Sequence, residues 1–216
     1  MRSSKDNTSE VVDELAFNRD GTLLASAGMD NMVKLWSVKE GKEIRTLSRD
    51  AGHVIELAFN HDGTTLASAT FDGEVVMWNP GSGKETRRFE VDCDRLYCFA
   101  FVGTTNLIAV GDSEGILSIW DTDSGEELIS VDAHNGILFS IAVRSDGKLL
   151  ATCGKDQSVK LWDVANLREV ATLEGHSESV IGVQISKDGE RLASQGGGDK
   201  NEVMLWQIPF DTLLAK

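Results

Sequence analysis

The sequence is poor in proline, tyrosine, cysteine and positive charge. Its 216 residues include 2 Pro, 1 Tyr and 3 Cys. Acidic residues number 35 against 21 basic residues, which gives a net charge of −14. No nucleic-acid ligand is expected, because neutralising phosphates needs clustered Lys and Arg. The same charge disfavours binding to an anionic membrane surface.

Long apolar runs are missing as well. No stretch approaches 18 apolar residues, so no membrane-spanning helix is predicted, and the polar first ten residues lack the apolar segment of a secretory signal. The odd number of cysteines (Cys93, Cys98 and Cys153) favours reduced thiols and a cytoplasmic protein. Neither these cysteines nor the scattered histidines have metal-ligand spacing, so no metal site and no cofactor are predicted.

What the sequence does contain is a repeat. The five tryptophans follow one another at intervals of 42, 42, 42 and 44 residues, at Trp36, Trp78, Trp120, Trp162 and Trp206. Asp-Gly pairs keep the same period, at Asp20-Gly21, Asp62-Gly63, Asp146-Gly147 and Asp188-Gly189. A period of this length indicates stacked structural units.

The second unit illustrates the pattern. Four short runs, separated by turns rich in Gly and Asp, span residues 55–59, 65–69, 74–78 and 84–89. Such runs predict a four-stranded antiparallel meander, and no window carries a helical period. The fourth run is charged, which places it at an outer edge in water. The predicted fold is therefore all-β, a β-propeller of five four-stranded antiparallel blades.

Several short motifs resemble the WD-repeat (WD40) β-propeller family. Trp120-Asp121 and Trp162-Asp163 match the dipeptide that ends the third strand, and Gly175-His176 matches the pair that opens a repeat. The resemblance covers about residues 10–208 and implies a structural tetrad of His, Ser or Thr, Asp and Trp in each blade. The fourth unit carries the full set (His134, Thr152, Asp156 and Trp162). The fifth is expected to use His176, Ser194, Asp199 and Trp206, with the Asp shifted by a two-residue insertion.

The first three units lack the histidine. Thr8, Asp50 and Asp92 stand at its position. The first two units keep the other members, as Ser26, Asp30 and Trp36 and as Ser68, Asp72 and Trp78. The third unit is the most degenerate, with Val110, Glu114 and Trp120.

A hydrolase triad is the alternative interpretation of the His, Ser/Thr and Asp sets. The structural tetrad is favoured because each set repeats in register with a Trp, and because no GxSxG nucleophile elbow is present. No catalytic residue is therefore predicted. A His176→Ala variant separates the two hypotheses: an enzyme would lose turnover with its fold intact, whereas a tetrad would lose stability.

The resemblance also implies where a partner binds. In WD-repeat propellers, partner contacts cluster on the face formed by the loops that join strand four to strand one and strand two to strand three. Large apolar side chains in loops mark interfaces. Phe71 and Tyr97 are the strongest candidates, whereas Ile137 and Phe139 are equally compatible with packing between blades. The candidate partner-binding residues are Met29, Ile55, Phe71, Arg95, Tyr97, Ile137, Phe139 and Lys155.

The sequence thus predicts a non-enzymatic scaffold that binds a protein or peptide with a basic surface. The alternative is a regulatory or sensor segment of a larger signalling protein or assembly. A polar tail is expected over residues 1–9 and the propeller over 10–216. Residues 213–216 are a candidate short outer strand for the last blade. Closure has three possible forms: a closed five-blade ring, which is favoured, a piece of a larger ring, or a ring completed by another chain through open blade edges.

Overall fold

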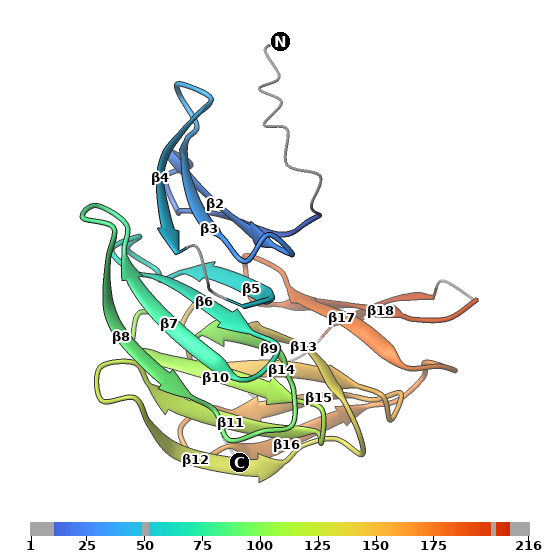
Figure 1. Ribbon diagram of the computed structural model, residues 1–216. Coiled ribbons are helices and arrows are strands. Elements are labelled where there is room, and N and C mark those ends of the chain that lie inside the picture. Colours follow the sequence, from blue (N-terminus) through green and yellow to red (C-terminus); the bar gives the residue numbers. More distant parts are fainter. Residues whose placement is uncertain (1–10, 49–51, 200–201, 208–216) are drawn as a thin grey trace. The chain divides into compact units, whose positions relative to one another are not determined.

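The computed structural model describes residues 11–48, 52–199 and 202–207 (Figure 1). These residues form strands joined by turns, and they include no helix that is long and apolar enough to cross a membrane. Two compact units divide the chain, Met1–Asp92 and Cys93–Lys216.

The first unit contains two antiparallel sheets, each with its strands in sequence order. One sheet comprises β1 (Val12–Phe17), β2 (Leu23–Gly28), β3 (Val33–Ser37) and β4 (Lys42–Ser48). The other comprises β5 (Val54–Phe59), β6 (Leu66–Thr70), β7 (Glu74–Asn79) and β8 (Lys84–Glu90).

The second unit contains three antiparallel sheets. The first of them comprises β9 (Leu96–Phe101), β10 (Leu107–Asp112), β11 (Ile116–Asp121) and β12 (Glu126–Asp132). The next comprises β13 (Leu138–Val143), β14 (Leu149–Gly154), β15 (Val159–Asp163) and β16 (Arg168–Leu173). The last has three described strands, β17 (Val180–Ile185), β18 (Arg191–Gly196) and β19 (Val203–Gln207).

Each repeat therefore forms one sheet, which we call a blade and number from first to fifth. The all-β fold class with five antiparallel blades is confirmed. Residues 1–9 and the expected outer strand at 213–216 lie outside the described residues. The tail boundary and the closure of a ring accordingly stay predictions.

The turns between first and second strands explain the repeated Asp-Gly pairs. The carboxylate of Asp20 accepts the backbone N–H of Thr22 at 2.9 Å, and Gly21 adopts a φ of 70°, which only glycine takes easily. The third repeat lacks the pair, yet it turns in the same place. There the Thr105 N–H donates to the Val102 carbonyl, and Gly103 provides the positive φ.

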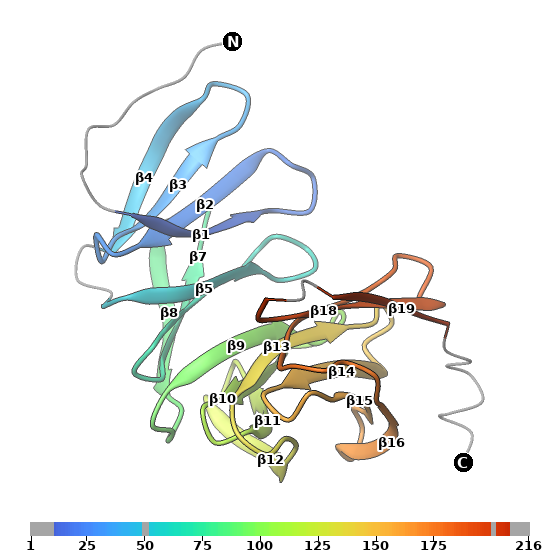
Figure 2. The same cartoon turned by 90° about the vertical axis from the view of Figure 1, so that its right-hand side faces the viewer.

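Within each unit, neighbouring blades pack face to face through equivalent positions. The first strands of neighbouring blades lie side by side, β1 next to β5 and β9 next to β13 (Figure 2). We call the face that packs on the following blade the front face, and the opposite one the rear face. The front face supplies alternate residues of the third strand and the rear face alternate residues of the first. These sets are Val33 and Leu35 with Leu57 and Phe59, Leu117 and Ile119 with Ile141 and Val143, and Val159 and Leu161 with Val183 and Ile185.

Burial decreases from the inner to the outer strands of a blade. The second strands β6 and β14 are buried throughout, whereas β8 is exposed at every residue except Phe89. The charged fourth run thus lies at the outer edge, as the sequence predicts, and the apolar runs make the core between blades.

Candidate interaction surface

In every blade the tryptophan indole N–H donates to a buried hydroxyl. The acceptors in the first, second, fourth and fifth blades are the predicted ones, at 2.8–2.9 Å: Ser26, Ser68, Thr152 and Ser194. The third blade differs, because Val110 has no acceptor. Trp120 donates instead to Ser118 of its own strand, at 2.8 Å. A buried N–H needs an acceptor, and in this blade a serine of the third strand supplies it in place of a residue on the second strand.

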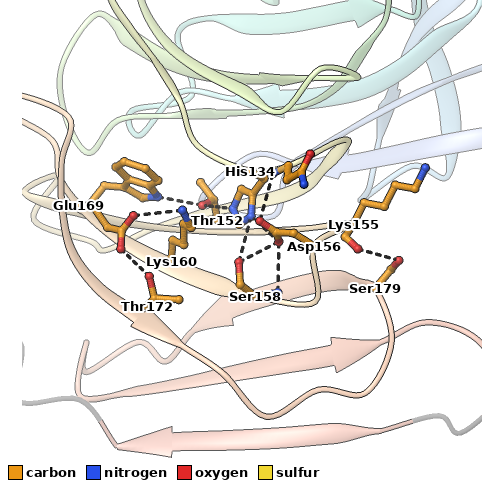
Figure 3. A network of polar contacts seen from close by, with 11 residues as sticks. His134, Thr152, Lys155, Asp156, Ser158, Lys160, Glu169, Thr172 and Ser179 are labelled. Atoms are coloured by element: carbon orange, nitrogen blue, oxygen red, sulfur yellow. Dashed lines mark hydrogen bonds and ion pairs between the residues drawn. The ribbon is translucent and has the colours of Figure 1, made fainter.

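The fourth blade contains the complete tetrad (Figure 3). His134 Nδ1 lies 2.9 Å from Asp156 Oδ1, and its Nε2 lies 2.7 Å from Thr152 Oγ1. The carboxylate of Asp156 also accepts the Asn135 N–H at 3.1 Å and the Ser158 hydroxyl at 2.8 Å. These bonds fasten the loop before β13 to the turn between β14 and β15.

The electrostatics of this tetrad favour a neutral imidazole. Burial lowers the pKa of His134, although the bond to Asp156 acts in the opposite direction. Burial also opposes the ionisation of Asp156, but its hydrogen bonds to His134 and Ser158 outweigh that effect and hold its pKa below the usual value. A neutral ring donates from Nδ1 to the carboxylate and accepts the Thr152 hydroxyl at Nε2, while that hydroxyl accepts the indole N–H of Trp162.

The fifth blade departs from the predicted tetrad at its acid. His176 Nε2 lies 2.7 Å from Ser194 Oγ, as expected, but the carboxylate near its Nδ1 belongs to Glu202, at 3.5 Å. Glu202 also accepts the backbone N–H and the hydroxyl of Ser177. Asp199, the predicted acid, lies exposed in the turn between β18 and β19.

Two polar residues that contact the imidazoles were missed by the sequence reasoning. Glu202 precedes Trp206 by four residues, and Ser158 precedes Trp162 by the same interval. Ser158 Oγ lies 3.3 Å from His134 Nδ1, which is the atom that Glu202 faces in the other ring. Counting back from the tryptophan, rather than forward across the insertion, would have found both.

A glycine makes room for each tetrad histidine. A Cβ added to Gly154 would lie 2.8 Å from Cγ of His134, and one added to Gly196 would lie 3.0 Å from Nδ1 of His176. A Cβ at 2.8 Å would clash with the ring and one at 3.0 Å would be tightly packed against it, so each imidazole takes up much of the space that a Cβ would need.

The second and third blades carry side chains at the same position. These are Thr70 and Asp112, and both are buried. Thr70 Oγ1 accepts the N–H of Glu74 at 3.1 Å, and Asp112 Oδ1 accepts the N–H of Ile116 at 2.9 Å. A side chain here therefore holds the turn between second and third strands directly, in place of the histidine network.

The first blade shows a further variation. Asp30 pairs with Lys34 at 3.0 Å and accepts the Met32 N–H, so its carboxylate stabilises the turn between β2 and β3. Thr8 and Asp50, which stand at the His position of the first two repeats, lie outside the described residues. Asp92 and Glu114 of the third repeat are exposed.

In every blade one backbone hydrogen bond joins the two loops that were predicted to face a partner. The N–H of the first residue after the second strand donates to the carbonyl of the residue just before the first strand, over 2.7–3.1 Å. We call these residues, with the apolar side chains beside them, the loop surface. The donor and acceptor pairs are Met29 with Val11, Phe71 with His53, Ser113 with Arg95, Lys155 with Ile137, and Gly197 with Ser179.

Side-chain contacts bridge neighbouring blades on the loop surface within each unit. In the second unit, Tyr97 and Phe139 meet edge to face with ring centroids 5.9 Å apart. In the first unit, Phe71 stacks on His53 at 6.4 Å, and His53 Nε2 lies 2.9 Å from Asp13 Oδ2.

The predicted partner-binding residues differ in exposure. Ile55, Phe71, Tyr97, Ile137 and Phe139 are half-buried, so each leaves part of its apolar surface in water. Met29 is 54% exposed, and Arg95 and Lys155 are exposed too.

The tetrads are poorly placed for catalysis. Thr152 is completely buried and Ser194 is 2% exposed, and both imidazole side chains have no exposed surface. A nucleophilic hydroxyl must reach its substrate. The arrangement instead produces firmly held loops that display apolar and charged side chains.

Comparison with known proteins agrees with this geometry. The family described as WD domain, G-beta repeat, matches residues 2–37, 41–79, 125–163 and 167–207, which is more than half of the chain. The unmatched stretch contains most of the third blade, where the tetrad is most altered. No curated protein matches the chain. With four matched repeats and a Trp–hydroxyl bond in each of five blades, the chain belongs to the WD40 repeat family.

Proposed function

We propose that the chain is a non-enzymatic interaction platform that holds a protein or peptide partner on its loop surface. The observation that carries this proposal is the repeated bond between the two loops of each blade, with half-buried aromatic side chains beside it. Loops fixed in advance lose little conformational freedom on binding, which favours affinity.

Apolar anchors and charge together indicate the kind of partner. Tyr97 and Phe71 combine a large apolar area with few rotatable bonds, which is typical of residues that dominate interface energetics. The net charge of −14 attracts a partner with a basic surface and would raise its association rate. We place this interaction in the cytoplasm, because the odd number of cysteines in the chain favours reduced thiols.

Paired substitutions test the proposal in each unit. In the first unit, Phe71→Glu is compared with Ile44→Glu, since Ile44 is 50% exposed on the outer strand β4. In the second, Tyr97→Glu is compared with Leu128→Glu, which alters a residue 55% exposed on β12. Both members of a pair add the same charge at an accessible apolar position.

The measurement is quantitative affinity capture from extracts of the cells that express the protein, with circular dichroism to verify the fold. We expect the loop-surface variants to lose at least tenfold of the bound partner and the outer-strand variants to keep it. Equal retention by folded Phe71→Glu and Tyr97→Glu proteins would refute the proposal.

A further inference from the structure

The contact between blades has the same two halves wherever it is described. Third-strand residues of a front face meet first-strand residues of a rear face between the first and second, third and fourth, and fourth and fifth blades. Val33, Leu35, Val159 and Leu161 are at most 1% exposed in these contacts. The described contacts therefore show which residue positions a front face and a rear face each contribute.

The rear face of the first blade is one such half without a counterpart in its unit. Leu15 and Phe17 of β1 are 61% and 62% exposed. Leu57 and Val183, which occupy the position of Leu15 in the second and fifth blades, are 4% and 5% exposed. The first blade therefore presents the apolar set that elsewhere is covered by a front face.

The front face of the fifth blade is the opposite half. Val203 and Leu205 of β19 are 69% and 81% exposed, although their equivalents in the fourth blade are completely buried. Beside them lies a hollow of about 310 Å³ whose lining includes Gly182, Ala193 and Gln195. In the fourth blade, the first strand of the following blade covers the equivalent face.

We propose that the front face of the fifth blade binds the rear face of the first blade of a second copy of this chain. The contact continues the established interface between blades, because it joins the same strand positions with the same apolar residue types. The two halves are different surfaces, so the association is head to tail. This inference is independent of the partner proposed for the loop surface.

Two glutamines distinguish this contact from the internal ones. Gln184 is exposed at a position where the other blades have Ala16, Ala58, Ala100 and Ala142. Gln195 is exposed where the others have Ala27, Ala69, Gly111 and Cys153. Covered amide groups need new hydrogen-bond partners, and larger side chains keep the blades farther apart. The contact is therefore weaker than one between blades of the same chain, and the dimer should dissociate on dilution.

Charge also modulates the association. Each copy carries a net charge of −14, so two copies repel each other at low ionic strength. Added salt screens this repulsion, whereas an apolar contact persists in salt. We expect the dimer fraction to rise with salt concentration.

The test uses complementation between two variants in sedimentation velocity. Leu205→Lys disables only the front face, and Leu15→Lys disables only the rear face. Leu128→Lys on β12 is the matched control, because it adds the same charge to another exposed leucine. We expect concentration-dependent dimers or larger species for the wild type and control, and monomers for each face variant alone. An equimolar mixture of the two face variants should dimerise again, because one intact front face meets one intact rear face.

Three results would overturn the proposal. A wild-type monomer at all concentrations and salt levels would mean that copies do not join, including the case in which the contact forms within one chain. Dimers that survive both face substitutions would place the association elsewhere. A mixture that stays monomeric, although the wild type dimerises, would exclude the head-to-tail pairing.

Discussion

Removing the imidazole of His134 should lower the free energy of unfolding substantially. A threonine at position 154, which the second blade carries at the equivalent Thr70, should restore part of the loss. His134→Ala deletes contacts of 2.7 Å and 2.9 Å, so the buried Thr152 hydroxyl loses the acceptor of its proton and the Asp156 carboxylate loses one of its hydrogen bonds. Each unsatisfied buried group costs about 1–3 kcal/mol, and the cavity adds to that. We expect the free energy of unfolding to fall by about 3–5 kcal/mol.

The recovery depends on the glycine that faces the ring. Gly154→Thr alone should destabilise by about 1–3 kcal/mol, because its Cβ would lie 2.8 Å from the imidazole. In the double variant the ring is gone, and the threonine can accept the Ser158 N–H as Thr70 accepts that of Glu74. The Ile137 carbonyl still lies 2.9 Å from the added Cβ, so the recovery is partial. The double variant should therefore be at least about 1 kcal/mol more stable than the sum of the single changes predicts.

Urea unfolding followed by tryptophan fluorescence measures this double-mutant cycle. His53→Ala is the control, since its side chain is 44% exposed with one ion-pair contact, and it should change stability by no more than about 1 kcal/mol. If the two single changes simply add, the imidazole and the side chain at position 154 are not alternatives, and the reasoning fails.

Three more predictions concern titration and the fifth blade. Burial, followed by repulsion from Glu14, raises the pKa of Glu56 to about 8 from 4.5, so the native state binds an extra proton between these pH values. Stability should fall by at most roughly 5 kcal/mol as pH rises through this window, and Glu56→Gln should abolish that slope in denaturant titrations at pH 5 and 8.5. For His134 the dependence on pH runs in the opposite direction, because burial lowers its pKa in the native state. Its contribution to stability is complete above about pH 6.5 and declines as pH falls. The difference in stability between wild type and His134→Ala should therefore narrow from pH 7 to pH 5.5. In the fifth blade, thermal unfolding should show Glu202→Ala destabilised by about 1–3 kcal/mol and Asp199→Ala within about 0.5 kcal/mol of wild type, whereas the reverse order would restore Asp199 as the acid.

Much of the fold was predictable because period and turn chemistry agree. The tryptophan spacing located every blade, and alternation with Asp-Gly turns located the strands. The third blade forms the same sheet although Val110 and Thr104-Thr105 break the pattern, since its apolar alternation and Gly103 still satisfy the strands and the turn.

The site was less predictable, because hydrogen-bond partners can move between positions that lie close only in space. The hydroxyl of the third blade moved to Ser118 on the adjacent strand. In the fifth blade the carboxylate nearest to the imidazole is that of Glu202, beyond the insertion, and it lies 3.5 Å from Nδ1 without a hydrogen bond to it. The competition for space between the His134 ring and a side chain at position 154 follows only from the three-dimensional structure, in which a Cβ built on Gly154 would lie 2.8 Å from the ring.

Site-specific photo-crosslinking shows whether a partner contacts the loop surface. A photoreactive phenylalanine analogue is placed at Phe71, Tyr97, Ile44 or Leu128, and the protein is irradiated inside the cells that express it. We expect discrete covalent adducts from positions 71 and 97 and none from the outer strands at 44 and 128. Adducts confined to 44 and 128, with none from 71 or 97, would show that the partner binds the outer strands and not the loop surface.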